Sequence, residues 1–167
     1  MKEGEKAIDF LLEDKDGEKY SLKDFNSDYL VLYFYPRDST PGCTIQAQEF
    51  TKNLDKFKKL NAFVLGISGG NEETKKKFYE KFNLRVLLLS DPDYSISAKY
   101  GVYEEKSFLG RKFLGIKRTT FVLDKNRNII KVFEKVNPKK HSEEVMGFIK
   151  RLTEKILPNI EELVKLV

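Results

Sequence analysis

The feature of this sequence that most restricts its fold is a run of seven apolar or aromatic residues, 29–35, which Pro36 ends. A run so short and so uniformly apolar is typical of a β-strand that is covered on both faces, as in the middle of an α/β sheet. A second buried strand is predicted at 62–67, and apolar residues between the two strands recur at spacings of three and four over 43–60. That spacing predicts an amphipathic helix, so strand, helix and strand alternate.

The rest of the chain extends this alternation. Residues 8–13 and 19–22 flank a turn that contains Asp16 and Gly17, and they predict an N-terminal β-hairpin. These elements together predict an α/β protein with a thioredoxin-like fold, in which a mixed central sheet has helices on both faces. The further elements expected are a helix at 71–82 capped by Asn71, a strand at 86–89, a short helix at 91–101, a hairpin of 119–123 with 128–133, and a last helix carrying Val145, Ile149, Leu152 and Ile156.

Two segments leave alternatives open. Residues 102–117 are interrupted by glycines and rich in basic and aromatic residues, and they predict either a mobile loop or an irregular hairpin. Pro158 predicts a break in the last helix, which makes 158–167 a possible C-terminal extension. The apolar stripe of this extension either packs against the core or forms an oligomer contact, and it consists of Ile160, Leu163 and Leu166.

Length and composition limit the class of protein. A chain of 167 residues, 40% of them hydrophobic, is long enough for one full core, so we expect a single domain over 1–167. No stretch reaches the roughly 18 apolar residues of a membrane span, and the amino terminus lacks the apolar core of a signal peptide, so the expected compartment is the cytoplasm. The 31 basic and 26 acidic residues are interleaved, so the net charge of +5 does not predict nucleic-acid binding.

The chain contains one cysteine, Cys43, and one histidine, His141. One cysteine excludes an intrachain disulfide, and the two residues are too few for a zinc or iron–sulfur site. Because the strand stops at Pro36 and the helix begins near Cys43, we expect the thiol at the carboxyl edge of the sheet and at a helix N-terminus, where unpaired N–H groups stabilise a thiolate. A lone intracellular cysteine is more often a small buried apolar residue, but Thr40 and Gly42 beside it favour a reactive thiol.

A motif around the cysteine resembles that of a known family. Pro36, Thr40 and Cys43 stand in the pattern Pro-x-x-x-Thr-x-x-Cys. This pattern is similar to that of the peroxiredoxins, and most closely to the branch called bacterioferritin comigratory protein or peroxiredoxin Q. The resemblance implies a thiol-dependent peroxidase that reduces hydrogen peroxide and organic hydroperoxides and requires no metal or organic cofactor. It covers nearly the whole chain, with further similar segments at 89–91, 100–102, 105–107 and 118–124.

The resemblance also implies a role for each residue of the motif. Cys43 matches the nucleophile, whose thiolate attacks the peroxide and becomes a sulfenic acid. Arg118 matches the family arginine that lies beside the sulfur, stabilises the thiolate and holds the peroxide oxygens. Thr40 is expected to hydrogen-bond the peroxide through its hydroxyl, and Pro36 is expected to shield the thiolate from solvent. The alternatives are that Arg118 forms a surface ion pair, and that Thr40 and Pro36 only shape the turn.

Two positions depart from the family pattern. Gln48 stands where many members of the branch carry a second, resolving cysteine, so the sulfenic acid must be reduced by an external thiol. That thiol belongs to a thioredoxin-like or glutaredoxin-like protein, to a small molecule, or transiently to Cys43 of another copy, and the chain is expected to be a monomer or a homodimer. Gln46 stands where relatives commonly have glutamate, so its contact with Arg118 is expected to be a neutral hydrogen bond instead of an ion pair.

Other functions fit the sequence less well. A disulfide oxidoreductase needs a second thiol, but Gln46 occupies the position that would complete Cys-x-x-Cys. A cysteine hydrolase needs a histidine base, and His141 lies far along the chain and is predicted to be a solvated surface residue. Two alternatives remain: a redox sensor, in which oxidation of Cys43 changes binding to a partner, and an inert thioredoxin-like interaction domain. Repeated consumption of peroxide distinguishes an enzyme from a redox sensor, and slow reaction of the thiol with peroxide would indicate the inert domain.

Overall fold

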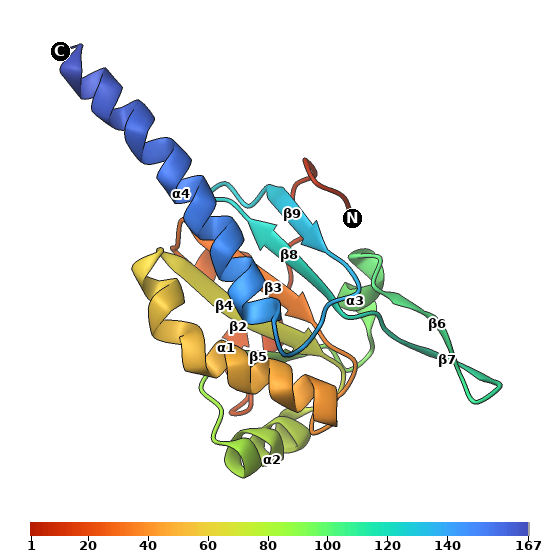
Figure 1. The fold of residues 1–167 in the computed structure, drawn as a ribbon. Helices are drawn as coiled ribbons and strands as arrows, with labels where there is room; N and C mark the ends of the chain where they lie inside the picture. Colours follow the sequence, from red (N-terminus) through yellow and green to blue (C-terminus); the bar gives the residue numbers. More distant parts are fainter. Residues whose placement is uncertain (167) are drawn as a thin grey trace.

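The computed structural model describes the backbone of residues 1–166 and the side chains of residues 1–155 and 163–166. Figure 1 shows strands in the middle of the molecule with helices packed around them. The elements are, in chain order, β1 (Leu12–Glu13), β2 (Lys19–Tyr20), the 3-10 helix η1 (Leu22–Asp24), β3 (Tyr29–Phe34), α1 (Pro41–Lys59), β4 (Ala62–Ser68), α2 (Glu72–Phe82), β5 (Leu87–Ser90), α3 (Ser95–Lys99), β6 (Tyr103–Phe108), β7 (Arg111–Ile116), β8 (Thr119–Leu123), β9 (Ile129–Phe133) and α4 (His141–Lys165).

Seven of the strands form one mixed sheet in the order β2-β1-β5-β4-β3-β8-β9. β3, β4 and β5 run parallel, as strands joined by crossover helices do. β8 pairs antiparallel with β3, β9 pairs antiparallel with β8, and β1 joins the edge at β5 in the antiparallel direction. The predicted mixed sheet and N-terminal hairpin are confirmed, although each strand of that hairpin has only two residues.

The side chains of β3 alternate between two apolar clusters, which explains why almost the whole strand is buried. Leu30, Leu32 and Phe34 face the side of the sheet that is covered by α3, η1 and the N-terminal segment. Val31 and Tyr33 face the other side, under α1, α2 and α4. Helices therefore cover both faces of the sheet, as predicted. The helices contribute Cys43, Phe50, Phe57, Phe78, Val145 and Ile149 to the second cluster.

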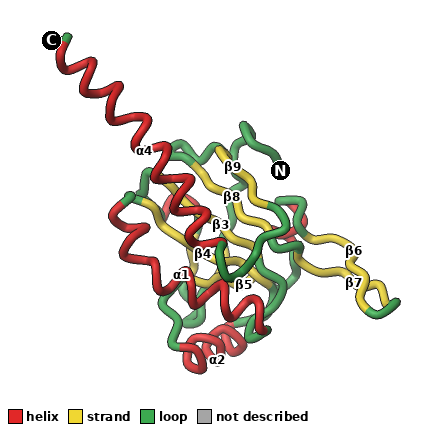
Figure 2. The backbone as a smooth tube through the Cα atoms, viewed as in Figure 1, coloured by secondary structure: helices red, strands yellow, loops and turns green. Residues whose placement is uncertain are grey.

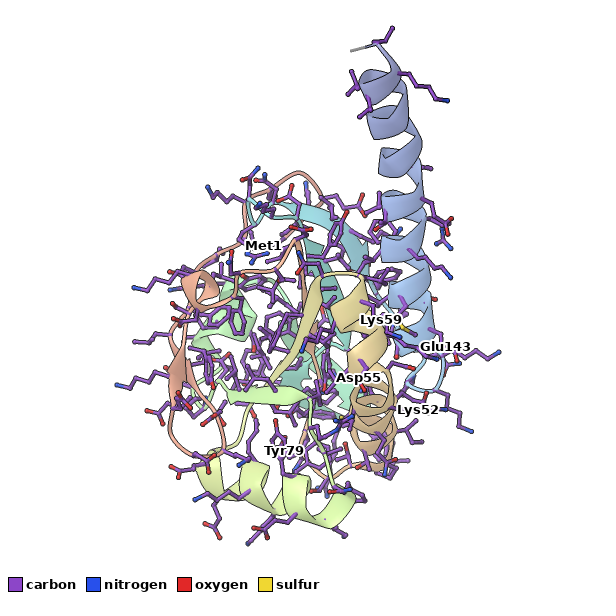
Figure 3. The ribbon with its side chains drawn as sticks, turned by 90° about the vertical axis from the view of Figure 1, so that its left-hand side faces the viewer. Met1, Lys52, Asp55, Lys59, Tyr79 and Glu143 are labelled. Carbon is purple, nitrogen blue, oxygen red and sulfur yellow. The ribbon has the colours of Figure 1, made fainter. Side chains whose placement is uncertain are left out.

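Helix α2 is attached to the sheet and begins at a defined residue. Figure 3 shows Tyr79 pointing from α2 toward the sheet, where its hydroxyl donates to the carbonyl of Val86 and accepts from the N–H of Leu88. At the start of α2, the Asn71 side chain accepts from the N–H of Thr74 at 3.0 Å, so the predicted helix cap is confirmed. The Thr74 hydroxyl donates to Asp38 at 3.0 Å, which holds the first turn of α2 beside the loop that joins β3 to α1.

Residues 102–117 form a hairpin, the second of the two predicted alternatives, and it is more regular than expected. β6 and β7 pair antiparallel over six residue pairs. Leu109 and Gly110 form the turn with φ of 50° and 78°, the left-handed conformation that a two-residue hairpin turn requires. The hairpin belongs to a sheet of its own and extends away from the body of the protein (Figures 1 and 2).

The prediction that the last helix breaks at Pro158 is wrong, because α4 continues past this residue to Lys165. A proline removes one backbone hydrogen bond and crowds the preceding turn, but the helical bonds on either side of it carry α4 on. Figures 1 and 3 show the carboxyl half of α4 extending beyond the sheet. Leu163 and Leu166 are 63% and 84% exposed, so this end does not pack against the core. The oligomer contact stays a prediction, and the side chain of Ile160 lies outside the described residues.

Within the part of the chain that the structure describes, no helix combines enough length with enough apolar character to cross a membrane.

Candidate active site

Cys43 lies in the first turn of α1, directly after the loop that follows β3. The helix begins at Pro41, two residues before the predicted start, and proline at the first helical position suits a helix N-terminus because it has no N–H to leave unpaired. Cys43 is 1% exposed and packs in the apolar cluster under α1. The expected location, at the carboxyl edge of the sheet and at the amino end of a helix, is therefore the observed one.

Arg118 contacts the thiol directly. It immediately precedes β8, whose first residue, Thr119, pairs with Phe34 at the end of β3, so the arginine reaches the same sheet edge as α1. Its Nη2 donates to Cys43 Sγ at 3.3 Å. A Cβ atom at Gly42 would lie 3.2 Å from this Nη2, so the glycine leaves room for the guanidinium beside the sulfur. A fixed cation at hydrogen-bond distance stabilises the thiolate form.

Gln46 holds the other side of the same guanidinium. Its side chain is fully buried one turn after Cys43, and its Oε1 accepts from Arg118 Nη1 at 2.5 Å. The contact is the hydrogen bond to a neutral amide that the sequence led us to expect in place of an ion pair. Gln46 Nε2 is also buried, and among the described residues it has no hydrogen-bond partner. The amide thus fixes Arg118 without placing a negative charge beside the thiolate.

Thr40 and Pro36 belong to the loop that covers this site, but the structure does not join them to the sulfur by a hydrogen bond. The Thr40 hydroxyl donates to the carbonyl of Arg37 at 2.9 Å, and the Thr40 carbonyl accepts from both the N–H and the hydroxyl of Thr44. Thr40 therefore shapes the loop, and it occupies the N-cap position of α1 without a side-chain hydrogen bond to the helix. Pro36 is half-buried at the end of β3 and lines a cavity beside the loop.

Comparison with known proteins shows the family of this chain. The AhpC/TSA family profile matches residues 4–132. The chain belongs to the AhpC/TSA family. It is 40% identical to the peroxiredoxin Bcp of Bacillus subtilis, over 91% of this chain and 97% of the relative, and 40% identical to the peroxiredoxin Bcp of Escherichia coli, over 90% and 96%. Peroxiredoxins are thiol-dependent peroxidases, and this chain is one of them.

Solved structures of this kind have the same fold. The structure of a Xylella fastidiosa PrxQ mutant matches with a TM-score of 0.86 and 30% identity, over 92% of this chain and 98% of that one. The bacterioferritin comigratory protein of Xanthomonas campestris matches with a TM-score of 0.79 and 32% identity, over 85% and 90%. The thioredoxin-like architecture of this peroxiredoxin is therefore confirmed.

His141 of this peroxiredoxin is buried, so the prediction of a solvated surface histidine is wrong. The turn before α4, in which the His141 N–H donates to the carbonyl of Asn137, places the ring on the inner side of the helix. The ring is 1% exposed, and its Nε2 lies 2.7 Å from Thr120 Oγ1. Burial, together with the positive charge of Arg118, lowers the pKa of His141 from 6.5 to about 4. The histidine is therefore neutral at physiological pH and contacts β8 instead of Cys43.

A cavity of about 680 Å³ lies next to the motif loop, and its existence was not predicted. Its walls come from four segments: the loop after β3, the segment that leads from β4 into α2, the loop before α3 and the β6–β7 hairpin. Lys106 of β6 reaches this cavity, and burial together with the positive charge of Arg118 lowers the pKa of its ammonium group, while negative charge on the Cys43 sulfur and on Glu104 opposes the shift. The cavity is lined by residues that include Pro36, Ser39, Tyr94, Lys106, Phe113 and Leu114.

The sequence also did not predict that Asp38 and Lys75 form a buried pair, although Asp38 lies inside the loop that contains the motif. Lys75 Nζ is 3.0 Å from Asp38 Oδ2, and both side chains are almost completely removed from solvent. A charged residue in a loop and a lysine on a Lys-rich helix both predict solvated positions, so neither carried a signal of burial in the sequence.

Proposed function

We propose that this peroxiredoxin is a one-cysteine peroxidase, in which a hydroperoxide oxidises Cys43 and a thiol from outside the chain reduces it again. The observation that carries the proposal is the 3.3 Å hydrogen bond from Arg118 Nη2 to the sulfur of the chain's one cysteine. An inert buried thiol needs no guanidinium held against it. A nucleophilic thiolate does, because the fixed positive charge favours the ionised sulfur.

The oxidation step transfers one oxygen atom to sulfur. The Cys43 thiolate attacks one oxygen of the hydroperoxide, so that an S–O bond forms while the O–O bond breaks. The sulfur loses two electrons and becomes a sulfenic acid, and the peroxide gains them. The leaving oxygen takes up a proton and departs as water or as an alcohol.

Arg118 serves this step as a donor to the peroxide oxygens. Negative charge moves from the sulfur to the leaving oxygen as the O–O bond breaks, and a donor that is already in place stabilises this charge without reorganisation. Gln46 keeps the guanidinium oriented through its bond to Nη1. Thr40 supplies a second donor when its hydroxyl turns from the carbonyl of Arg37 to the peroxide, and Pro36 shields the thiolate without adding an N–H.

The substrates proposed are hydrogen peroxide and organic hydroperoxides. The Xanthomonas campestris relative is described as reducing alkyl peroxides. In the present chain, the cavity beside Pro36 has apolar walls at Tyr94, Phe113 and Leu114, which suit an alkyl group.

The reductant is proposed to be a thioredoxin-like or glutaredoxin-like protein, or a small thiol. The chain has no second cysteine, and the residue five positions after Cys43 is the exposed Gln48. The outside thiolate attacks the sulfenic sulfur, water leaves, and a second thiolate resolves the mixed disulfide. Because Cys43 is 1% exposed, a protein reductant reaches it only after the first turn of α1 has opened.

The test is peroxide consumption by the purified protein with each candidate thiol, run beside the Cys43→Ser variant. We expect many turnovers with at least one thiol, no activity in the variant, and a mixed disulfide on Cys43 by mass spectrometry. Activity that survives in Cys43→Ser would overturn the proposal. Consumption that stops after about one equivalent with every reductant would instead indicate a redox sensor.

A further inference from the structure

The loop that contains the Pro36, Thr40 and Cys43 motif is attached to α2 by a buried ion pair that the chemistry proposed above does not use. Asp38, midway between Pro36 and Thr40, lies with its Oδ2 3.0 Å and its Oδ1 3.3 Å from Lys75 Nζ. The Lys75 side chain is fully buried, and the Asp38 side chain is 6% exposed. The pair thus connects the middle of the motif loop to the inner face of a helix.

Hydrogen bonds from three elements complete this attachment. Asp38 accepts from the Tyr35 hydroxyl at 2.6 Å and from the Thr74 hydroxyl at 3.0 Å. Lys75 Nζ also donates to Ser68 Oγ at 2.9 Å and to the carbonyl of Gly69 at 2.9 Å. The Ser68 hydroxyl also donates to Asp38 Oδ1 at 3.3 Å. Groups from the end of β3, the end of β4 and the start of α2 therefore converge on one carboxylate and hold the loop at Asp38.

Stability alone is a weak reason for such a pair. Burial lowers the pKa of Lys75, and the negative charge of Asp38 opposes the shift. A charged ammonium at this buried position has lost its hydration, and this loss costs free energy that the attraction to Asp38 must offset. Apolar residues of similar volume often replace a buried ion pair with no loss of stability. Lys75 lies on the same face of α2 as the buried Phe78, but its Nζ is surrounded by polar groups of Asp38, Ser68 and Gly69. The pair instead provides directional contacts, which determine where the loop stands.

The backbone beside Asp38 requires this kind of support. Ser39 has a φ of 63°, in the left-handed region that residues with a side chain rarely adopt. Gly70 comes so close to Asp38 that a Cβ atom there would lie 2.9 Å from Oδ2. A strained conformation persists only where the surrounding contacts impose it, and the contacts of Asp38 are the ones next to Ser39.

We propose that the Asp38–Lys75 pair is a positioning device for the peroxidase reaction, which holds Pro36 and Thr40 in the arrangement that aligns a peroxide with Cys43. This inference rests on the proposed function. The O–O bond must lie in line with the attacking sulfur, and a displacement of about 1 Å from such a geometry costs about 100-fold in rate. A small alkylating reagent needs only the thiolate and has no such requirement. The pair should therefore affect the reaction with peroxide and leave alkylation almost unchanged.

The experiment compares two second-order rate constants of Cys43, one with hydrogen peroxide and one with iodoacetamide, measured by rapid quenching and mass spectrometry. The main variant is Asp38→Asn with Lys75→Met, which removes both charges together and so leaves no unpaired buried ion. Tyr35→Phe, which removes one donor to Asp38 and keeps the ring, is the milder second variant. The matched control is Glu72→Gln with Lys76→Met, which removes the exposed ion pair one residue further along α2.

We expect the main variant to react with peroxide slower than the parent by about tenfold or more, while its alkylation stays within about threefold. We expect Tyr35→Phe to show a smaller loss of the same kind, and the control to match the parent in both reactions. Parent-like peroxide rates in folded variants would overturn the inference, and so would equal losses in both reactions. If the main variant does not fold, the peroxide and iodoacetamide rate constants of Tyr35→Phe test the inference by the same criteria. If the parent itself fails to react with peroxide, the proposed function fails first and the inference fails with it.

Discussion

Arg118 Nη2 donates a hydrogen bond to Cys43 Sγ at 3.3 Å, although the two residues are 75 positions apart in the chain. The contact exists because β8 lies next to β3 in the sheet, so the residue before β8 and the helix after β3 share one edge. The same guanidinium bonds to Gln46. This short chain of contacts is the part of the site on which the activity should depend most.

Removal of the Arg118 side chain should have the largest effect after removal of the sulfur itself. Arg118→Ala loses both the charge beside the thiolate and the donors to the peroxide, and loss of such a donor typically costs about 10²–10³ in rate. Thr40→Val should cost less, because the Thr40 hydroxyl is bonded to the Arg37 carbonyl in the resting site. The measurement is the rate constant of Cys43 oxidation by hydrogen peroxide, with the exposed Arg111→Ala as the matched control. Near-parent rates in both variants would refute the assigned roles.

Gly42→Ala should slow the enzyme by moving Arg118. The new Cβ would lie 3.2 Å from Arg118 Nη2, which is tight enough that the guanidinium must shift away from the sulfur. We expect a peroxide rate between those of the parent and Arg118→Ala. Gly147→Ala in α4 is the control, since its Cβ would meet only the end of the Arg151 side chain at 3.3 Å. A parent-like rate in Gly42→Ala would show that the space beside Gly42 is not needed.

The stability of the protein should fall at acid pH because His141 is buried in its neutral form. The pKa of about 4 in the folded state lies below the ordinary 6.5, so the unfolded chain binds more protons between these two values. The free energy of unfolding should therefore decrease as pH falls from 6.5 to 4, by about 1.4 kcal/mol per unit and about 3 kcal/mol in total. Glu144 lies 3.4 Å from Nδ1 but is 56% exposed, and it offsets little of this cost.

The check on His141 is urea unfolding at several pH values for the parent and for His141→Gln, which keeps a polar partner for Thr120 but does not titrate. The carboxylates titrate in both proteins, so the difference between the two curves isolates the histidine. A difference that is independent of pH over this window would contradict the prediction.

Gly66→Ala should destabilise the fold. Gly66 lies in β4, and a Cβ atom there would lie 2.6 Å from Tyr33 Cζ and 2.7 Å from Leu88 Cδ2, both in the buried cluster under α1. Overpacking of this kind costs about 1–3 kcal/mol. The thermal midpoint should fall, while Gly115→Ala, whose Cβ would make ordinary contacts at 3.4 Å, should leave it near that of the parent. An unchanged midpoint in Gly66→Ala would mean that Tyr33 and Leu88 move aside freely.

Local sequence was enough to predict most of the helices and strands and the part of the site that lies between β3 and α1. The run 29–35 became β3, because residues that are apolar on both faces are stable only between two apolar layers. Pro36, Thr40 and Cys43 are close in the chain, so their place between a strand end and a helix start followed from the same pattern. The errors came at Pro158, where the helix continued, and at His141, where polarity suggested a surface position.

The sequence by itself determined which segments form strands and helices, and it placed the thiol at the start of a helix. The family resemblance pointed to Arg118 as the partner of that thiol, but only the tertiary structure shows how the two residues meet. The pairing of β8 with β3 brought Arg118 to the sulfur, and the docking of α2 brought Lys75 to Asp38. The reason is physical: periodicity reports the environment of a residue within its own element, whereas contacts between distant elements depend on strand order and packing, which no local pattern contains.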